Sequence, residues 1–123
     1  MNIKFIPLLL SLVFGLNMGA VMAKSPSELN DLEIAHVAYI ADNIDIRYAH
    51  LALAISSNPD IHAFAKTMIR DHTAVNDQAL ALLKKLGAQP QDNFLSQALT
   101  KNAEKLINEM NEIKGVKTEK KVK

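Results

Sequence analysis

The sequence predicts an all-α fold, an antiparallel bundle of three helices in one small domain. Two long stretches carry apolar residues at alternating steps of four and three, the period of a helix with one buried face. Capping residues mark where these stretches begin, and glycine or a short polar turn marks where they end. We expect helices at about 31–56, 59–86 and 92–114 of a domain that covers residues 24–115.

Residues 1–23 have the pattern of a signal peptide. Lys4 supplies a positive start, a short apolar run follows over residues 5–16, and Val21-Met22-Ala23 fits a cleavage site. An uncleaved anchor is the alternative, but the run is shorter than the ~20 residues that a membrane span requires. We therefore expect a periplasmic or secreted protein, with no stable membrane span after cleavage.

The composition excludes several classes of protein. The chain has no cysteine, so disulfides and thiolate zinc sites are ruled out, and stability must come from helix packing, association or a ligand. Residues 24–113 hold eight Lys or Arg against twelve Asp or Glu, whereas residues 114–123 hold five Lys against one Glu. The basic character lies in a tail, which we expect to be disordered over 116–123. Without an Arg cluster, and with few aromatic residues, the chain does not fit a nucleic-acid-binding protein.

The first helix is predicted to begin after Asn30, which offers a capping box with Glu33. Ser25 and Glu28 offer the same spacing as an alternative start. The apolar stripe of this helix runs through Val37, Ala41, Ile44, Tyr48, Leu51 and Ile55.

The second helix has both ends marked. Asn58 can cap it, Pro59 suits its first position and Gly87 suits its stop. One polar residue, His72, lies in its apolar seam, which consists of Ile61, Ala65, Met68, His72, Val75, Ala79, Leu82 and Leu86.

A short turn near Ser57 makes the two helices an antiparallel pair. The register then places His72 level with the turn of the first helix that contains Asp42 and Asp45. Small residues surround Asp45 on its own helix, which lets the facing helix approach closely and leaves the carboxylate partly desolvated. These small residues are Ala38, Ala41, Ala49 and Ala52.

The third helix is predicted to begin near Asp92 and to end at Gly115. Its stripe is interrupted at Asn102 and Ala103, so we expect it to be the least well packed of the three. The apolar positions are Phe94, Leu95, Ala98, Leu99, Leu106, Ile107, Met110 and Ile113.

Four short motifs resemble the exported bacterial family catalogued as domain of unknown function 4142. They are L-A-L-A at 51–54, S-N-P-D at 57–60, F-A-K-T-M at 64–68 and R-D-H-T-A-V-N at 70–76, within a similarity that covers about residues 31–115. The family is placed among ferritin-like helical bundles, so the resemblance implies that fold. Its members typically carry an acidic residue in the middle of the first helix, for which Asp45 is the nearest match.

Family members usually continue into a fourth helix, where this chain has its Lys-rich tail. The resemblance therefore describes a shortened member with the fourth helix missing. Three amphipathic helices of this kind would expose an apolar groove. We expect a partner to fill it, either a second copy of the chain in a homo-oligomer or an envelope protein.

His72 is the main candidate for a functional site. One interpretation is a core histidine that Asp42, Asp45, Tyr39 or Asn76 satisfies. The other, which the ferritin resemblance suggests, is a metal site for iron or copper with Asp45 and His72 as ligands.

A second metal site would use Met68 with His72, one turn apart on the same seam, since a thioether and an imidazole suit Cu(I). A ferritin-type di-iron site would need Glu three residues before His72, and Ile69 stands there. No cofactor is therefore certain.

The other histidines, His36, His50 and His62, are interpreted as solvated surface residues. As carboxylates for acid–base chemistry, Asp42, Asp45 and Asp71 are instead interpreted as a solvated or salt-bridged helix face, with Arg47 or Arg70 as available partners. No complete catalytic set is present, so an enzyme is disfavoured. We expect an exported protein that acts by association, with a metal-dependent redox protein as the alternative.

Overall fold

A computed structural model describes residues 24–122, with side chains described for residues 24–114, and it confirms the all-α fold of three helices. Residues 24–122 contain no strand. The predicted signal peptide, residues 1–23, lies outside the described part of the chain. The elements are the 3-10 turn η1 (Pro26–Glu28) and the helices α1 (Asp31–Ile55), α2 (Pro59–Lys85) and α3 (Phe94–Val122).

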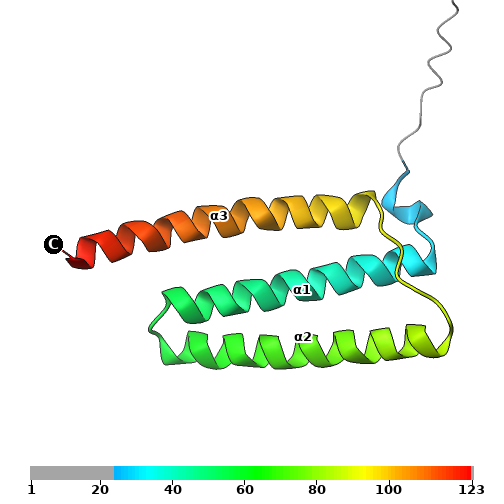
Figure 1. The fold of residues 1–123 in the computed structure, drawn as a ribbon, viewed down its shortest axis with the longest axis horizontal. Helices are drawn as coiled ribbons and strands as arrows, with labels where there is room; N and C mark the ends of the chain where they lie inside the picture. Colours follow the sequence, from blue (N-terminus) through cyan, green and yellow to red (C-terminus); the bar gives the residue numbers. More distant parts are fainter. Residues whose placement is uncertain (1–23, 123) are drawn as a thin grey trace, which may run out of the picture.

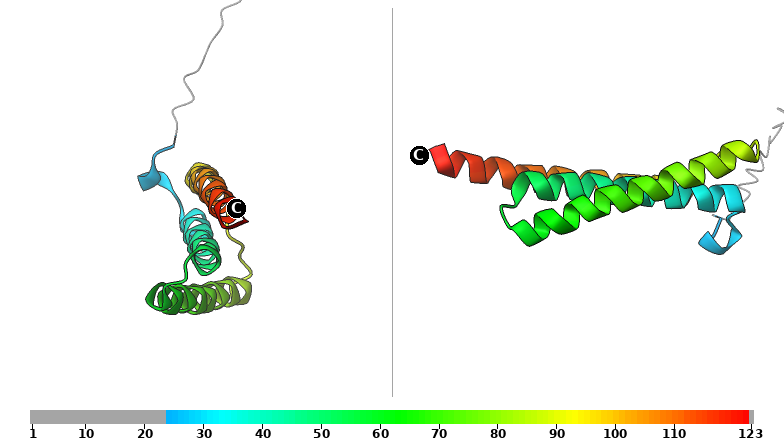
Figure 2. Two further views of the ribbon diagram at one scale, coloured as in Figure 1. Left: turned by 90° about the vertical axis from the view of Figure 1, so that its left-hand side faces the viewer. Right: turned by 90° about the horizontal axis from the view of Figure 1, so that it is seen from below.

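Helix α1 is the centre of the arrangement. Helix α2 returns antiparallel along one side of α1, and α3 runs parallel to α1 along the other side (Figure 1). Both outer helices pack mainly on α1, and α2 crosses it at an angle (Figure 2). The three helices thus form a layer with α1 in the middle, and they do not close around a common core.

Both capping boxes at the N-terminal end are used. The backbone N–H of Ser25 donates to Glu28 Oε2 at 2.6 Å and starts η1, and Asn30 Oδ1 accepts from the Glu33 N–H at 2.9 Å and starts α1. Lys24 adds an ion pair to Glu33 at 2.6 Å. The carboxylate of Glu33 is stabilised by the Lys24 hydrogen bond and by the Asn30 N–H, which lowers its pKa.

The ends of α2 follow the sequence signals. Asn58 Oδ1 accepts from the N–H groups of Asp60 and Ile61. At the other end Gly87 has a φ of +65°, and its N–H donates to the Lys84 carbonyl. This is the left-handed conformation that glycine adopts at low cost, and it closes the helix.

Helix α3 differs from the prediction at its C-terminal end. It continues through Gly115 to Val122, so the predicted stop at Gly115 is wrong, while disorder of the tail over 116–123 stays a prediction. A single glycine inside a helix costs only about 1 kcal/mol relative to alanine, which weakens a helix without ending it.

The buried apolar residues of the three helices are small. Ala49 of α1, Ala65 of α2 and Ala103 of α3 are the only buried apolar residues among the described side chains. Ala103 is 2% exposed, so the prediction that it interrupts the packing stripe of α3 is wrong. Ser96 is buried two turns earlier on the same face of α3, and these two small residues let α3 approach α1 closely.

Large apolar side chains remain partly exposed. The predicted α2 seam is only half covered, because α1 runs along one edge of it: Ala65 is buried while Val75 and Leu82 are more than half exposed. We define the apolar face of α2 as the exposed set Phe64, Val75, Leu82 and Leu86. None of the helices in the described part of the chain combines the length and hydrophobicity needed to cross a membrane.

Candidate functional site

His72 points from α2 toward α1 and lies between two carboxylates. Its Nδ1 is 2.5 Å from Asp42 Oδ1, and its Nε2 is 3.8 Å from Asp45 Oδ2. The ring is only 25% exposed. His72 therefore faces the acidic turn of α1, as the register of the hairpin predicts.

The two contacts of the ring differ in kind. A carboxylate only accepts hydrogen bonds, so the short contact assigns a proton on Nδ1 of His72 that is donated to Asp42. Neutral imidazole has one donor, and its Nε2 would then present a lone pair toward Asp45. A histidine whose Nδ1 is held by a carboxylate is a common arrangement behind metal-binding Nε2 atoms.

A second polar pair crosses the hairpin one turn further along α2. Asn76 is 6% exposed, and its Nδ2 donates to Asn43 Oδ1 at 3.3 Å. Asn76 was a predicted partner for His72, but it pairs with Asn43. The two pairs satisfy the polar groups that the hairpin buries, as a helical pair requires.

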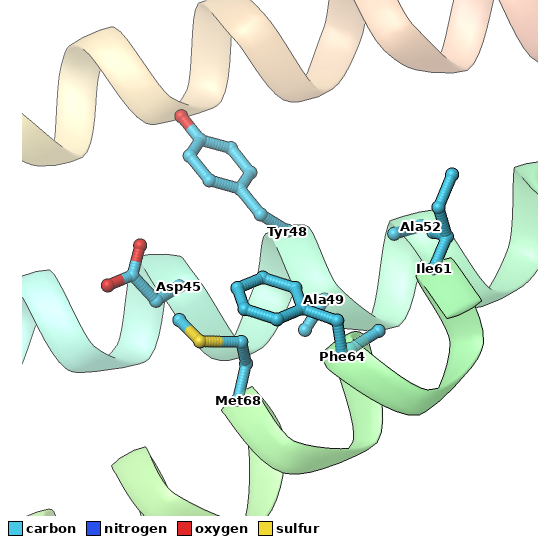
Figure 3. A pocket seen from close by; sticks show the side chains of 8 residues that line it. Asp45, Tyr48, Ala49, Ala52, Ile61, Phe64 and Met68 are labelled. Carbon is cyan, nitrogen blue, oxygen red and sulfur yellow. The ribbon is translucent and has the colours of Figure 1, made fainter.

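A cavity of about 250 Å³ lies between α1 and α2, next to this site and near the hairpin turn. Figure 3 shows the Asp45 carboxylate at one end, Ile61 and Ala52 at the other, and the ring of Phe64 between them. The Tyr48 hydroxyl is directed toward α3. The lining residues are Asp45, Tyr48, Ala49, Ala52, Ile61, Phe64, Ala65 and Met68.

The predicted metal ligands lie near one another but form a small donor set. Asp45 and Met68 line the cavity, and His72 Nε2 is within 3.8 Å of Asp45. Asp42 contacts the opposite nitrogen of the ring, so of the two carboxylates it is Asp45 that lies on the Nε2 side. Among the side chains described, those of residues 24–114, no group of three or more His, Cys, Asp or Glu is arranged to hold a metal ion. The three predicted ligands supply one carboxylate, one imidazole nitrogen and one thioether, and they lack the Glu-x-x-His pairs of a di-iron centre.

Sequence reasoning missed a polar cluster where α3 begins. His36 Nδ1 lies 2.9 Å from Ser96 Oγ and 3.6 Å from Asp92 Oδ1. The prediction that His36 is a solvated surface residue is wrong, because the start of α3 docks on α1 and leaves the imidazole only 19% exposed. Hydrogen bonds from Gln97 and Ser96 lower the pKa of Asp92.

This cluster has a structural role. Ser96 is 1% exposed and so is inaccessible to a substrate. The same nitrogen of His36, Nδ1, faces both the Ser96 hydroxyl and the Asp92 carboxylate, so the imidazole cannot relay a proton between them as it does in a catalytic triad. Asn93 Oδ1 caps α3 by accepting from Leu95 and Ser96, and its Nδ2 donates to the Glu33 carbonyl of α1. The signal in the sequence was Asn93 followed three residues later by Ser96.

The remaining titratable residues are structural or exposed. His62 Nε2 lies 2.6 Å from the Ser56 carbonyl in the hairpin turn, so its assignment to the solvated surface is also wrong. His50 is exposed. Asp71 forms an exposed ion pair with Arg70 at 2.7 Å, and this lowers the pKa of Asp71 and raises that of Arg70.

Comparison with known proteins identifies a family. Searches of curated proteins and of solved structures find no significant match. The model of one family, described as domain of unknown function (DUF4142), matches residues 17–121. Since the match covers most of the chain, the protein belongs to the DUF4142 family.

Proposed function

We propose that this protein acts by self-association through the apolar face of α2. The observation that carries the proposal is that small apolar side chains are buried while large ones are exposed, the reverse of the usual pattern in a protein core. Only alanines are buried among the apolar side chains described, while Phe64 and Leu86 are 66% and 68% exposed. Large apolar patches of this kind mark interaction sites on soluble proteins.

A second copy of the chain is the simplest occupant for this face. Two identical apolar faces are complementary to each other about a two-fold axis, which is the commonest symmetry of soluble oligomers. Leu82 and Leu86 lie one turn apart near the end of α2 and would form the centre of such a contact. The signal peptide predicted at residues 1–23 supports an envelope or extracellular setting for the assembly.

Sedimentation of the wild type and of the double variant Leu82→Ser, Leu86→Ser tests this proposal. We expect a dimer at micromolar concentration for the wild type and a monomer of unchanged helical content for the variant, because both leucines are already exposed in one copy. Ala74→Ser with Ala81→Ser, at exposed positions elsewhere on α2, is the matched control and should stay dimeric. A wild type that remains monomeric at high micromolar concentration would refute self-association.

Metal binding by Asp45 and His72, with Met68 as a further donor, is the second candidate. It is favoured by the contact of Asp42 with Nδ1, which leaves Nε2 directed toward Asp45. Bound iron or copper would supply redox chemistry, while Asp42 would orient the ring. Elemental analysis of tag-free protein should give a stoichiometric metal that His72→Ala loses, and Asp42→Asn should weaken affinity by about 10- to 100-fold. Absence of metal uptake by the wild type would rule the site out.

A further inference from the structure

We propose that the cavity between α1 and α2 binds a small organic cation with an apolar body, such as an alkylammonium. The inference uses the chemistry of the cavity wall and does not depend on self-association. Of the eight lining residues, Asp45 is the only charged one. A site with one anionic group at the end of an apolar wall selects a ligand of the opposite pattern.

The shape of the cavity fits an amphipathic ligand. Asp45 and Ala52 mark its two ends and are seven residues apart on α1, a distance of about 10 Å along the helix. Between these ends the wall includes Ala49 and the side chains of Phe64 and Met68. A six-carbon chain with a compact ammonium head matches this length and the volume of about 250 Å³.

The charged end of the cavity favours a cation over an anion or a neutral molecule. His72 Nε2 is the only ion-pair partner of Asp45 within residues 24–114, and at 3.8 Å it is beyond normal hydrogen-bond distance. The carboxylate is 44% exposed and retains acceptor capacity. Tyr48 and Phe64 also line the cavity, and aromatic faces attract ammonium groups. A neutral ligand would desolvate the carboxylate without compensating it.

Titration of the full chain with hexyltrimethylammonium tests the proposal, with the NMR signal of the Met68 methyl group as a local probe. We expect a saturable shift of this signal. Hexanol and hexanoate are matched for the chain and lack the positive charge, and each should bind at least about fivefold more weakly, the effect of roughly 1 kcal/mol. Equal binding of hexanol, or no saturable shift up to millimolar concentration, would overturn the proposal.

Two variants locate the ligand. Asp45→Asn should weaken binding of the cation by about fivefold or more and leave hexanol binding unchanged. Ala52→Leu should block the cavity, while Ala54→Leu, at an exposed position of the same helix outside the lining, should not. Binding that survives both Asp45→Asn and Ala52→Leu would place the ligand elsewhere and refute the site.

The result can be separated from the two functions proposed above. His72→Gln removes a metal ligand but should preserve binding of the organic cation. Leu82→Ser with Leu86→Ser abolishes the predicted dimer contact at the far end of α2 and should also preserve it. Because Phe64 belongs both to the cavity wall and to the apolar face of α2, the effect of protein concentration is measured on this double variant. A Met68 signal that shifts with the concentration of the variant alone would show that a second copy occupies the cavity, which would overturn the proposal.

Discussion

The Nδ1 atom of His72 lies 2.5 Å from Oδ1 of Asp42, and this contact joins the middle of α2 to the middle of α1. Both side chains are mostly withdrawn from solvent, with exposed fractions of 25% and 17%. A hydrogen bond that involves a charged group at such a position stabilises more than one on the open surface. We therefore expect His72→Gln and Asp42→Asn each to lower the free energy of unfolding by about 1 to 3 kcal/mol.

A double-mutant cycle on these two residues checks the origin of the loss. Chemical denaturation of the two single variants and the double variant should give a coupling energy of about 1 kcal/mol. The matched cycle of His72→Gln with Asp45→Asn should give a smaller coupling, because that contact is 3.8 Å long. Coupling near zero for the pair with Asp42 would contradict the contact.

Asn93 should be the residue on which the docking of α3 depends most. Its side chain caps the helix through Leu95 and Ser96 and also donates to the Glu33 carbonyl. We expect Asn93→Ala to cost about 2 kcal/mol, the upper end for loss of a cap. Asn93→Asp keeps the capping oxygen and loses the donor, so it should cost less.

Hydrogen exchange measured along the chain distinguishes local from global effects in these variants. Asn93→Ala should speed exchange in the first turns of α3 while leaving the α1–α2 hairpin protected. Asn102→Ala, at an exposed position of the same helix, is the control. Faster exchange in α2 with unchanged exchange in α3 would be the opposite of our expectation.

The carboxylate of Asp92 should make stability dependent on acid pH. Its pKa is lowered from the ordinary value of 3.8, first by the hydrogen bond from Gln97 and then by that from Ser96. A lowered pKa in the folded state means that the stabilisation is complete above the unfolded value and is lost as the pH falls through the lower folded value. The wild type should therefore be more stable than Asp92→Asn near neutral pH.

Denaturant unfolding of both proteins over a range of pH measures this effect. The difference in stability should stay constant above about pH 5 and shrink as the pH falls below the ordinary value of 3.8. A difference that grows on acidification would mean that the hydrogen bonds do not favour the charged form.

The α1–α2 hairpin could be predicted closely because its signals are local. Helix α2 begins after the capping residue Asn58 and stops before Gly87, where the conformational preferences of these two residues predict its ends. The distance from the turn then fixed which residues face each other, and so brought His72 to Asp42 and Asp45. Neither the partner on Nδ1 nor the cavity beside Asp45 could be derived, because both depend on side-chain positions.

The packing of α3 could not be predicted, because it does not follow the large apolar residues. The sequence pattern favours Leu106 and Ile113, yet these are about half exposed, and Ala103 is buried in their place. His36 was misassigned for the same reason, since its partner Ser96 is 60 residues away in the chain. When two helices pack through small residues, the sequence shows little of the apolar periodicity that predicts a buried face.

Ala103→Leu should separate α3 from α1. Ala103 is 2% exposed on the side of α3 that packs on α1, so the added atoms of leucine have no space unless the helices move apart. Overpacking of this kind costs about 1 to 3 kcal/mol. Ala98→Leu, an equal change at an exposed position of the same helix, should cost little and is the control. Chemical denaturation measures both, and equal costs for the two variants would mean that Ala103 does not lie in the α1–α3 contact.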